Sequence, residues 1–151
     1  MDIFSKKIIL VDEKFETKQE ALVNLANEFV ENDIGTEEFP SEILKREQIY
    51  PTGLPLGNIN VAIPHVDSKY VKEDQIGFMS LSTPVDFQMM TDNKEIVPVS
   101  MIFMLGLSQS DHQLMALEQL MNFFQNEDKL IELYNTKDSQ EVLKILDSIF
   151  E

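Results

Sequence analysis

The segment that most restricts the fold is residues 96–107, IVPVSMIFMLGL, the most apolar stretch of the chain. It is too short to span a bilayer, which takes about 20 apolar residues. Pro98 and the β-branched residues at its start favour a strand over a helix. A strand this apolar is buried on both faces, so the sequence predicts a sheet with this segment at its centre and other elements covering it.

Shorter apolar runs predict further strands. They are residues 7–11 (KIILV), 61–63 (VAI), 75–82 (QIGFMSLS) and 85–89, with Pro84 before the last and a turn at Asp92-Asn93 after it. We expect residues 75–82 and 85–89 to be separate strands, because proline cannot donate a hydrogen bond within a sheet.

Helical patterns alternate with these strands. Thr17 and Glu20 have the spacing of a capping box, and apolar residues follow at intervals of three and four until Gly35, the expected C′ residue. A second helix is predicted over about residues 37–48, with Pro40 in its first turn.

A third helix is predicted to begin at a capping box formed by Ser110 and Gln113. Its expected buried face consists of Leu114, Leu117, Leu120, Met121 and Phe124. Helices near residues 128–134 and 139–149 follow. The alternation indicates an α/β fold with a mixed sheet of about four or five strands flanked by helices on both faces. Since there is no linker or repeat, we expect a single domain covering residues 1–151.

Charge and cysteine content exclude several classes of function. The formal net charge is −15, and such a field repels a nucleic-acid backbone. The acidic residues therefore form either a solvated surface or a docking surface for a basic partner. The absence of cysteine excludes disulfides and thiolate chemistry. With no apolar run of membrane length and no signal-peptide pattern, we expect a cytoplasmic protein without direct membrane insertion.

The candidate functional residues centre on residues 57–67, GNINVAIPHVD, which place His65 after a short predicted strand. We expect the strand ladder to end at Pro64, leaving His65 at the mouth of the sheet on restricted backbone. His112, the other histidine of the chain, lies in the first turn of the helix after the central strand. Ligand sites form at strand ends in open α/β sheets, so the two histidines can converge there. The alternative is that each is structural or merely exposed.

A neutral imidazole can accept a phosphoryl group and pass it on if positive groups lie nearby. Arg46, near the end of the second helix, is a candidate for this, although a cation there also complements the helix dipole. Phosphoryl transfer of this kind needs no cofactor and no metal. The sequence contains no phosphate-binding glycine loop and no histidine pair at metal-ligand spacing. Two histidines with carboxylates can in principle hold a metal, but their placement does not argue for one.

Several motifs occur together in this order along the chain. They are Arg46-Glu47, Pro51-Thr52-Gly53, Gly57, Val61-Ala62-Ile63-Pro64-His65 and Asp111-His112-Gln113-Leu114. In this arrangement, from about residue 20 to the C-terminus, the chain resembles the enzyme IIA components of the sugar phosphotransferase system, in the fructose–mannitol (type-2) class.

The resemblance implies a cytoplasmic phosphocarrier. Phosphorylated HPr would donate a phosphoryl group to His65, which would pass it to a cysteine of the cognate enzyme IIB, while a membrane IIC component couples transfer to sugar uptake. By position, His112 and Arg46 would stabilise the phosphoryl group. Two alternatives remain: a IIA-like regulatory module whose phosphorylation state controls a partner, and a binding or scaffold domain with incidental histidines.

The chain departs from the family pattern in two places. Many members have a small residue after the active histidine, where this chain has Val66. The run GNINV, residues 57–61, is one residue longer than in mannitol-type members. This loop is more similar to that of the galactitol-type branch, so galactitol or a related sugar alcohol is the expected transport substrate.

Overall fold

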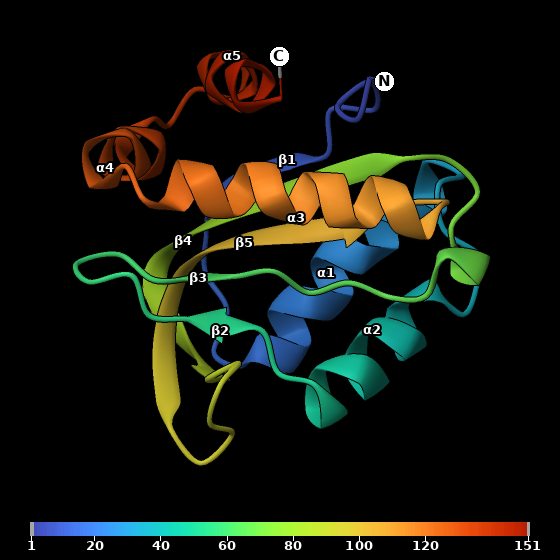
Figure 1. Cartoon of the computed structure of the whole chain (residues 1–151), viewed down its shortest axis with the longest axis horizontal. Helices are drawn as coiled ribbons and strands as arrows, with labels where there is room; N and C mark the ends of the chain where they lie inside the picture. The colour runs from blue at the N-terminus through green and yellow to red at the C-terminus, as the bar shows by residue number, and fades with distance from the viewer. Residues whose placement is uncertain (1, 151) are drawn as a thin grey trace.

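The computed structural model of the protein describes residues 2–150, which contain a five-stranded mixed sheet (Figure 1). The strand order is β1-β4-β5-β3-β2. The middle strand β5 (Ile96–Gly106) pairs antiparallel with β4 (Gln75–Gln88) and parallel with β3 (Val61–Ala62). At the edges, β1 (Ile9–Glu13) is parallel to β4, and β2 (Gly53–Leu54) is antiparallel to β3. The central position predicted for the most apolar segment is confirmed.

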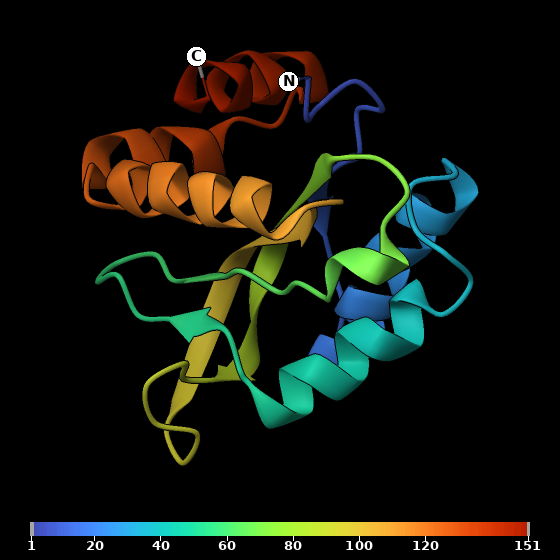
Figure 2. The same ribbon diagram turned by 45° about the vertical axis from the view of Figure 1, so that its right-hand side comes forward.

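Helices cover both faces of this sheet (Figure 2). One face carries α1 (Lys18–Glu31) and α2 (Phe39–Ile49). The other carries α3 (Ser110–Phe124), α4 (Glu127–Asn135) and α5 (Ser139–Ile149). The predicted α/β class, with a mixed sheet between helical layers, is confirmed. No helix within residues 2–150 is both long enough and apolar enough to cross a membrane.

The sheet separates two apolar cores, and β5 contributes to both. Ile102 and Met104 pack into the core beneath α1 and α2. Met101, Phe103 and Leu105 pack into the core beneath α3, α4 and α5. Because successive side chains of a strand point to opposite faces, a strand covered on both sides has to be apolar at nearly every position. This is the physical reason for the uninterrupted apolar run in the sequence.

The first helix begins as predicted but ends differently. The hydroxyl oxygen of Thr17 accepts a hydrogen bond from the Glu20 backbone N–H at 3.2 Å, which confirms the N-cap. Asp33 takes the left-handed conformation after the helix, with φ of 58°, so the expectation that Gly35 is the C′ residue is wrong. Gly35 has a packing role instead, because a Cβ there would lie 2.7 Å from Cγ of Phe39.

Residues 75–88 form one long strand, β4, rather than the two strands expected at residues 75–82 and 85–89. The pairing of β4 with β5 shifts register between Ser80 and Val85, so Pro84 lies within an irregular part of the ladder. A bulge accommodates a proline because residues there are not required to donate to the neighbouring strand. A local breaker in the sequence thus bends the strand instead of ending it.

The third helix, α3, differs from the expectation in its N-cap and in two residues of its buried face. Gln109 is its N-cap residue, no side-chain cap bond is present there in the described part of the chain, and Ser110 is already helical. The capping box assigned to Ser110 and Gln113 is therefore wrong. Leu120 and Phe124 are buried as expected, whereas Leu114 is 59% exposed and Met121 is 42% exposed.

Two stacked phenylalanines join α1, α2 and the sheet. The rings of Phe29 and Phe39 are 4.8 Å apart between centroids, with an interplanar angle of 14°. Phe29 lies directly on Gly77 of β4 and Gly106 of β5: a Cβ at these positions would be 2.6 Å and 2.7 Å, respectively, from its ring. The two glycines let the ring approach the backbone closely, and the stack holds the first residue of α2 in place.

We predict that Gly77→Ala destabilises the protein by about 1–3 kcal/mol, because the added methyl group overpacks a buried ring. Urea unfolding followed by circular dichroism measures the change. Asp86→Ala, at an exposed position of the same strand, is the control and should change the free energy of unfolding by less than about 0.5 kcal/mol. Equal unfolding midpoints for the two variants would contradict this account of the Phe29 contact.

Candidate functional site

The backbone of His65 is held by the central strand. The Leu105 N–H donates to the Pro64 carbonyl oxygen at 2.9 Å, and His65 lies opposite Leu105 in an isolated parallel bridge. The ladder of β3 with β5 ends at Ala62, just before Pro64, as expected, but pairing resumes in one isolated bridge at His65 because proline lacks a donor and keeps its acceptor. In Figure 1 the segment after β3 runs beside β5 towards the short helix η1 (Ser68–Tyr70).

The ring of His65 has a defined hydrogen-bond partner. Its Nδ1 lies 2.9 Å from the carbonyl oxygen of Ile63. A carbonyl oxygen can only accept, so Nδ1 carries the proton and Nε2 keeps its lone pair. Burial lowers the pKa of His65 below its ordinary value, the Ile63 hydrogen bond opposes this, and the charge of Arg46 lowers it further. The ring is thus favoured in its neutral form, with a free lone pair on Nε2.

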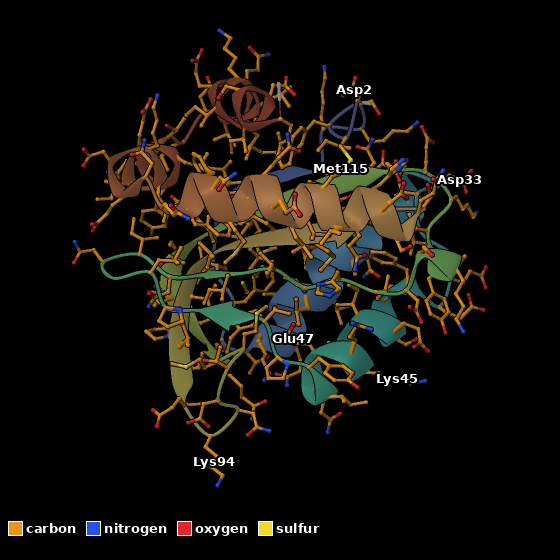
Figure 3. All side chains as sticks on the ribbon, viewed as in Figure 1. Asp2, Asp33, Lys45, Glu47, Lys94 and Met115 are labelled. Atoms are coloured by element: carbon orange, nitrogen blue, oxygen red, sulfur yellow. The ribbon has the colours of Figure 1, made fainter. Side chains whose placement is uncertain are left out.

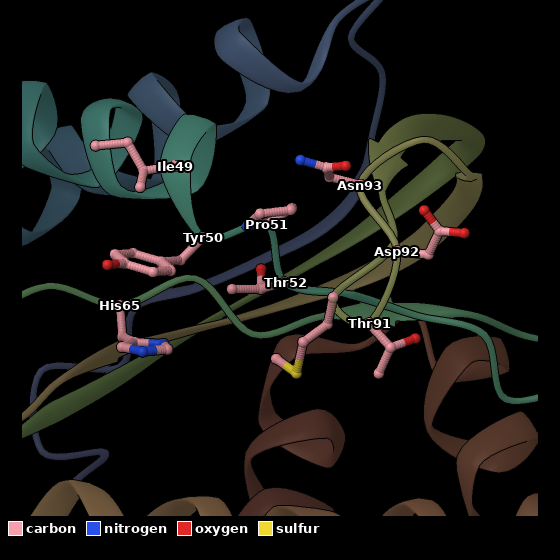
Figure 4. A pocket seen from close by; sticks show the side chains of 9 residues that line it. Ile49, Tyr50, Pro51, Thr52, His65, Thr91, Asp92 and Asn93 are labelled. Atoms are coloured by element: carbon pink, nitrogen blue, oxygen red, sulfur yellow. The ribbon is translucent and has the colours of Figure 1, made fainter.

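His65 lines a cleft of about 430 Å³ between the end of α2 and the turn that joins β4 to β5. Figure 4 shows the imidazole below Tyr50, with Thr52 further in and Thr91 across the cleft. Ile49 and Tyr50 on the rim are 66% and 62% exposed. The imidazole is half-buried in this open cleft, a position that an incoming group can approach from solvent.

Arg46 lies in the last turn of α2, on the other side of Tyr50 from this cleft. It lines an adjoining cleft of about 220 Å³ that shares Ile49 and Tyr50 with the first. Its guanidinium carbon is 5.2 Å from the centre of the Tyr50 ring. Its Nε is buried and has no hydrogen-bond partner within residues 2–150. Its place in the last turn of α2 agrees with the helix-dipole interpretation, whereas Arg46 and His65 line separate, adjoining clefts.

His112 is oriented by an aspartate that the sequence did not identify. The Nδ1 of His112 is 2.7 Å from Oδ2 of Asp74, and Oδ1 of Asp74 accepts bonds from the Ser108 N–H at 2.6 Å and the Ser108 hydroxyl at 2.8 Å. Burial acts to raise the pKa of Asp74, but these hydrogen bonds outweigh it and leave the pKa below its ordinary value. Because a carboxylate only accepts, Nδ1 of His112 carries a proton.

The two histidines lie at the same end of the sheet. His65 is opposite Leu105 on one side of β5, and Asp74 directly precedes Gln75, which pairs with Gly106 on the other side. Adjacent strands are about 4.8 Å apart, so His65 and Asp74, the partner of His112, flank the carboxyl end of the central strand. The sequence predicts that the two histidines converge at one site; the structure places them at the same end of the sheet, and His112 does not line the cleft of His65. Asp74 was missed because only its position before a buried strand marked it.

Glu47 is a second polar residue whose part in this region the sequence did not reveal. It is 2% exposed, and its carboxylate accepts bonds from the N–H and hydroxyl of Thr52 at 2.7 Å and 2.8 Å. Burial raises the pKa of Glu47 to about 7, against the opposing effect of these two bonds. Figure 3 shows Glu47 directed towards β2, whereas Lys45 extends from α2 into solvent.

The site therefore combines a neutral imidazole of fixed tautomer with a nearby arginine and a second histidine at the same end of the sheet. Within residues 2–150, no three side chains of histidine, aspartate or glutamate form a group that could hold a metal ion. The arrangement is suited to nucleophilic attack by Nε2 on an electrophile that brings negative charge with it, such as a phosphoryl group.

Comparisons of the sequence with known proteins agree with this chemistry. The galactitol-specific EIIA component of the Escherichia coli K12 phosphotransferase system is 26% identical over 126 residues, which cover 83% of each chain. The multiphosphoryl transfer protein of Shigella flexneri is 29% identical over 144 residues, or 93% of this chain. The chain spans only 16% of the length of that relative.

Solved structures share the fold. The enzyme IIA of the mannitol system, in its complex with phosphorylated enzyme IIB from Escherichia coli, has a TM-score of 0.76 at 22% identity and covers 94% of this chain and 95% of its own. The nitrogen regulatory protein IIA-Ntr of Neisseria meningitidis has a TM-score of 0.75 at 25% identity and covers 93% and 94%.

A family model described as "Phosphoenolpyruvate-dependent sugar phosphotransferase system, EIIA 2" matches residues 2–149, nearly the whole chain. This confirms the resemblance found in the sequence. Components of this family are phosphotransferases that work through a phosphohistidine intermediate. The protein belongs to the type-2 EIIA family of the sugar phosphotransferase system.

Proposed function

We propose that the protein is a cytoplasmic phosphocarrier that accepts a phosphoryl group from phosphorylated HPr on His65 and passes it to a cysteine of the cognate enzyme IIB. The observation that carries the proposal is the hydrogen bond from Nδ1 of His65 to the Ile63 carbonyl, which leaves Nε2 as a nucleophile in an open cleft. The galactitol-specific relative and the longer loop at residues 57–61 favour galactitol or a similar sugar alcohol as the substrate of the membrane IIC component.

Transfer to this chain is a displacement at phosphorus. The lone pair on Nε2 of His65 forms a new N–P bond while the N–P bond to the HPr histidine breaks, and that bonding pair leaves with the HPr imidazole. The Nδ1 proton stays in place, and the Ile63 carbonyl stabilises the positive charge that develops on the ring. In the second half-reaction a thiolate of enzyme IIB attacks phosphorus, and the pair of the breaking N–P bond returns to Nε2.

Three features would stabilise the phosphoryl group. Arg46 offers a guanidinium whose Nε has no hydrogen-bond partner within residues 2–150. The first turn of α3 offers backbone N–H groups. His112 can donate from Nε2 when its ring is an imidazolium, and the Asp74 carboxylate at 2.7 Å from Nδ1 balances the charge of that form.

Exposed apolar side chains around the site favour a protein as the phosphoryl donor and acceptor. Ile49, Tyr50 and Met90 lie on the rim of the His65 cleft, and Leu114 and Met115 are exposed on the α3 turns that follow His112. Apolar groups of this kind are typical of the core of a protein–protein interface. A docking protein that covers this surface would explain why Leu114, which the sequence placed in the core, is exposed.

A second candidate function is regulatory, and the similarity to the nitrogen regulatory protein of Neisseria meningitidis favours it. In that case His65 is still phosphorylated, but its phosphoryl group is not passed to an enzyme IIB. The two candidates therefore share the first half-reaction and differ in the second.

With phosphoenolpyruvate, enzyme I and HPr, we expect one acid-labile phosphate per chain, on His65. Radiolabel incorporation with mass spectrometry of peptides measures it. His65→Ala should abolish labelling, whereas His112→Ala, which removes the other histidine, should still be labelled at a lower rate. Labelling of His65→Ala would contradict the assignment.

A chase of labelled protein with galactitol-class and mannitol-class enzyme IIB then separates the carrier, which loses its label, from the regulator, which keeps it.

Arg46→Ala should slow phosphoryl transfer from HPr by roughly 100-fold, as expected when one preorganised charged donor is lost. The matched control is Lys45→Ala, which removes a positive charge one residue away from an exposed position. Rapid-quench measurement of the transfer rate decides the matter. If both variants slow transfer equally, only the overall charge matters and Arg46 does not contact the phosphoryl group.

Asp74→Asn should slow transfer about tenfold, because an amide cannot balance an imidazolium at His112. We expect the double variant Asp74→Asn with His112→Ala to be no slower than His112→Ala alone, since Asp74 acts through His112. Additive losses in this cycle would show that the aspartate acts independently of the ring.

A further inference from the structure

We propose that Glu47 is a positioning residue for His65, acting through Thr52 and Ile63 to hold the imidazole in its reactive tautomer and place. This inference rests on the proposed function, in which His65 is the phosphoryl acceptor. Glu47 has no contact with the ring, so its action has to pass through the intervening hydrogen bonds, which are continuous from one residue to the next.

The first part of the connection is a two-point contact between Glu47 and Thr52. Oε2 of Glu47 accepts from the Thr52 N–H at 2.7 Å, and Oε1 accepts from the Thr52 hydroxyl at 2.8 Å. Both residues are almost completely buried, at 2% and 3% exposure. Two short bonds to one residue remove its freedom to rotate or shift, so the start of β2 is fixed relative to α2.

The second part leads from Thr52 to the imidazole. The Thr52 carbonyl accepts from the Ile63 N–H at 3.3 Å, and the Ile63 carbonyl accepts from Nδ1 of His65 at 2.9 Å. The pairing of Gly53 with Ala62 continues the same contact into β2 and β3. Consecutive hydrogen bonds therefore link Thr52, Ile63 and His65, and Thr52 and His65 line the same cleft.

The cost of burying Glu47 argues that the contact has a purpose beyond packing. A carboxylate is expensive to bury, and burial raises the pKa of Glu47 to about 7 although the two bonds from Thr52 act to lower it. Glu47 also follows Arg46 directly on α2. Fixing Thr52 to α2 therefore fixes the separation between the helix that carries the proposed phosphoryl-binding arginine and the segment that carries the nucleophile.

The test compares four substitutions by NMR and by kinetics. Thr52→Val keeps the backbone bond to Glu47 but loses the hydroxyl bond, Thr52→Ser keeps both, and Glu47→Gln and Glu47→Ala weaken or remove the contact. Ring-nitrogen chemical shifts of ¹⁵N-labelled histidine report which nitrogen of His65 is protonated, without any phosphoryl donor. The signals of His112, which has its own partner in Asp74, provide an internal control.

In the wild type and in Thr52→Ser, we expect His65 to be protonated at Nδ1 alone and to accept phosphate at equal rates. In Thr52→Val and Glu47→Gln, the ring should become a mixture of the two tautomers, and transfer should slow by roughly 10-fold to 100-fold. If the Glu47 variants do not fold, the Thr52→Val and Thr52→Ser pair still decides the question.

Unchanged His65 shifts in folded Thr52→Val and Glu47→Gln would overturn the proposal. A rate loss that matches only the unfolded fraction, with unchanged shifts in the folded protein, would also overturn it, because the contact would then be merely structural. The tautomer measurement separates this inference from the proposed function. Changed shifts in a protein that accepts no phosphate would support the positioning by Glu47 and reject phosphoryl transfer.

Discussion

The structure depends on the continuous pairing of β5, the strand that is buried on both faces. The last residues of this strand hold the segments on either side: Leu105 donates to the Pro64 carbonyl next to His65, and Gly106 pairs with Gln75 next to Asp74. The same strand then leads through a short loop into α3 and His112. Because backbone hydrogen bonds in a buried sheet are costly to break, the segments that carry His65, Asp74 and His112 are held at the same end of the sheet.

A chain with a net charge of −15 presents an electrostatic problem for a site that receives a phosphoryl dianion. Two acidic groups near the candidate site serve as hydrogen-bond acceptors for neighbouring residues, whereas Asp92 lines the cleft of His65. Asp74 accepts from Ser108 and His112, and Glu47 accepts from Thr52. Burial lowers the pKa of the His65 imidazole, and the charge of Arg46 adds to that effect. Local donors can therefore outweigh the unfavourable field of the whole protein, because partly buried pairs are screened less than surface charges.

The sequence was sufficient for the architecture, and its failures follow from the range of the interactions concerned. The buried central strand, the cap at Thr17 and the helix at residues 139–149 depend on local patterns, and all three are confirmed. Gly35 was misread because its purpose is a contact with Phe39 and not a turn. Asp74 and Glu47 act through partners that only the folded chain defines, since single charged residues carry no periodic signal. Leu114 was misassigned because helical spacing alone does not establish that a side chain faces the core, and this one is exposed.

In the proposed function, the half-buried position of His65 reconciles two demands that a phosphoryl carrier faces. A deeply buried imidazole would be a rigid nucleophile that no second protein could reach, while a fully exposed ring would be accessible but free to rotate and to become protonated. Here the Ile63 carbonyl restrains the ring from the inside, and burial keeps it neutral, yet it opens onto a cleft with apolar side chains at its rim. A docking protein would cover that rim and exclude water, which strengthens every charge interaction at phosphorus. The partner would then complete the site, so that transfer is fast only within the complex. Between encounters, a phosphohistidine on the restrained ring would be less exposed to hydrolysis than one on a freely rotating ring.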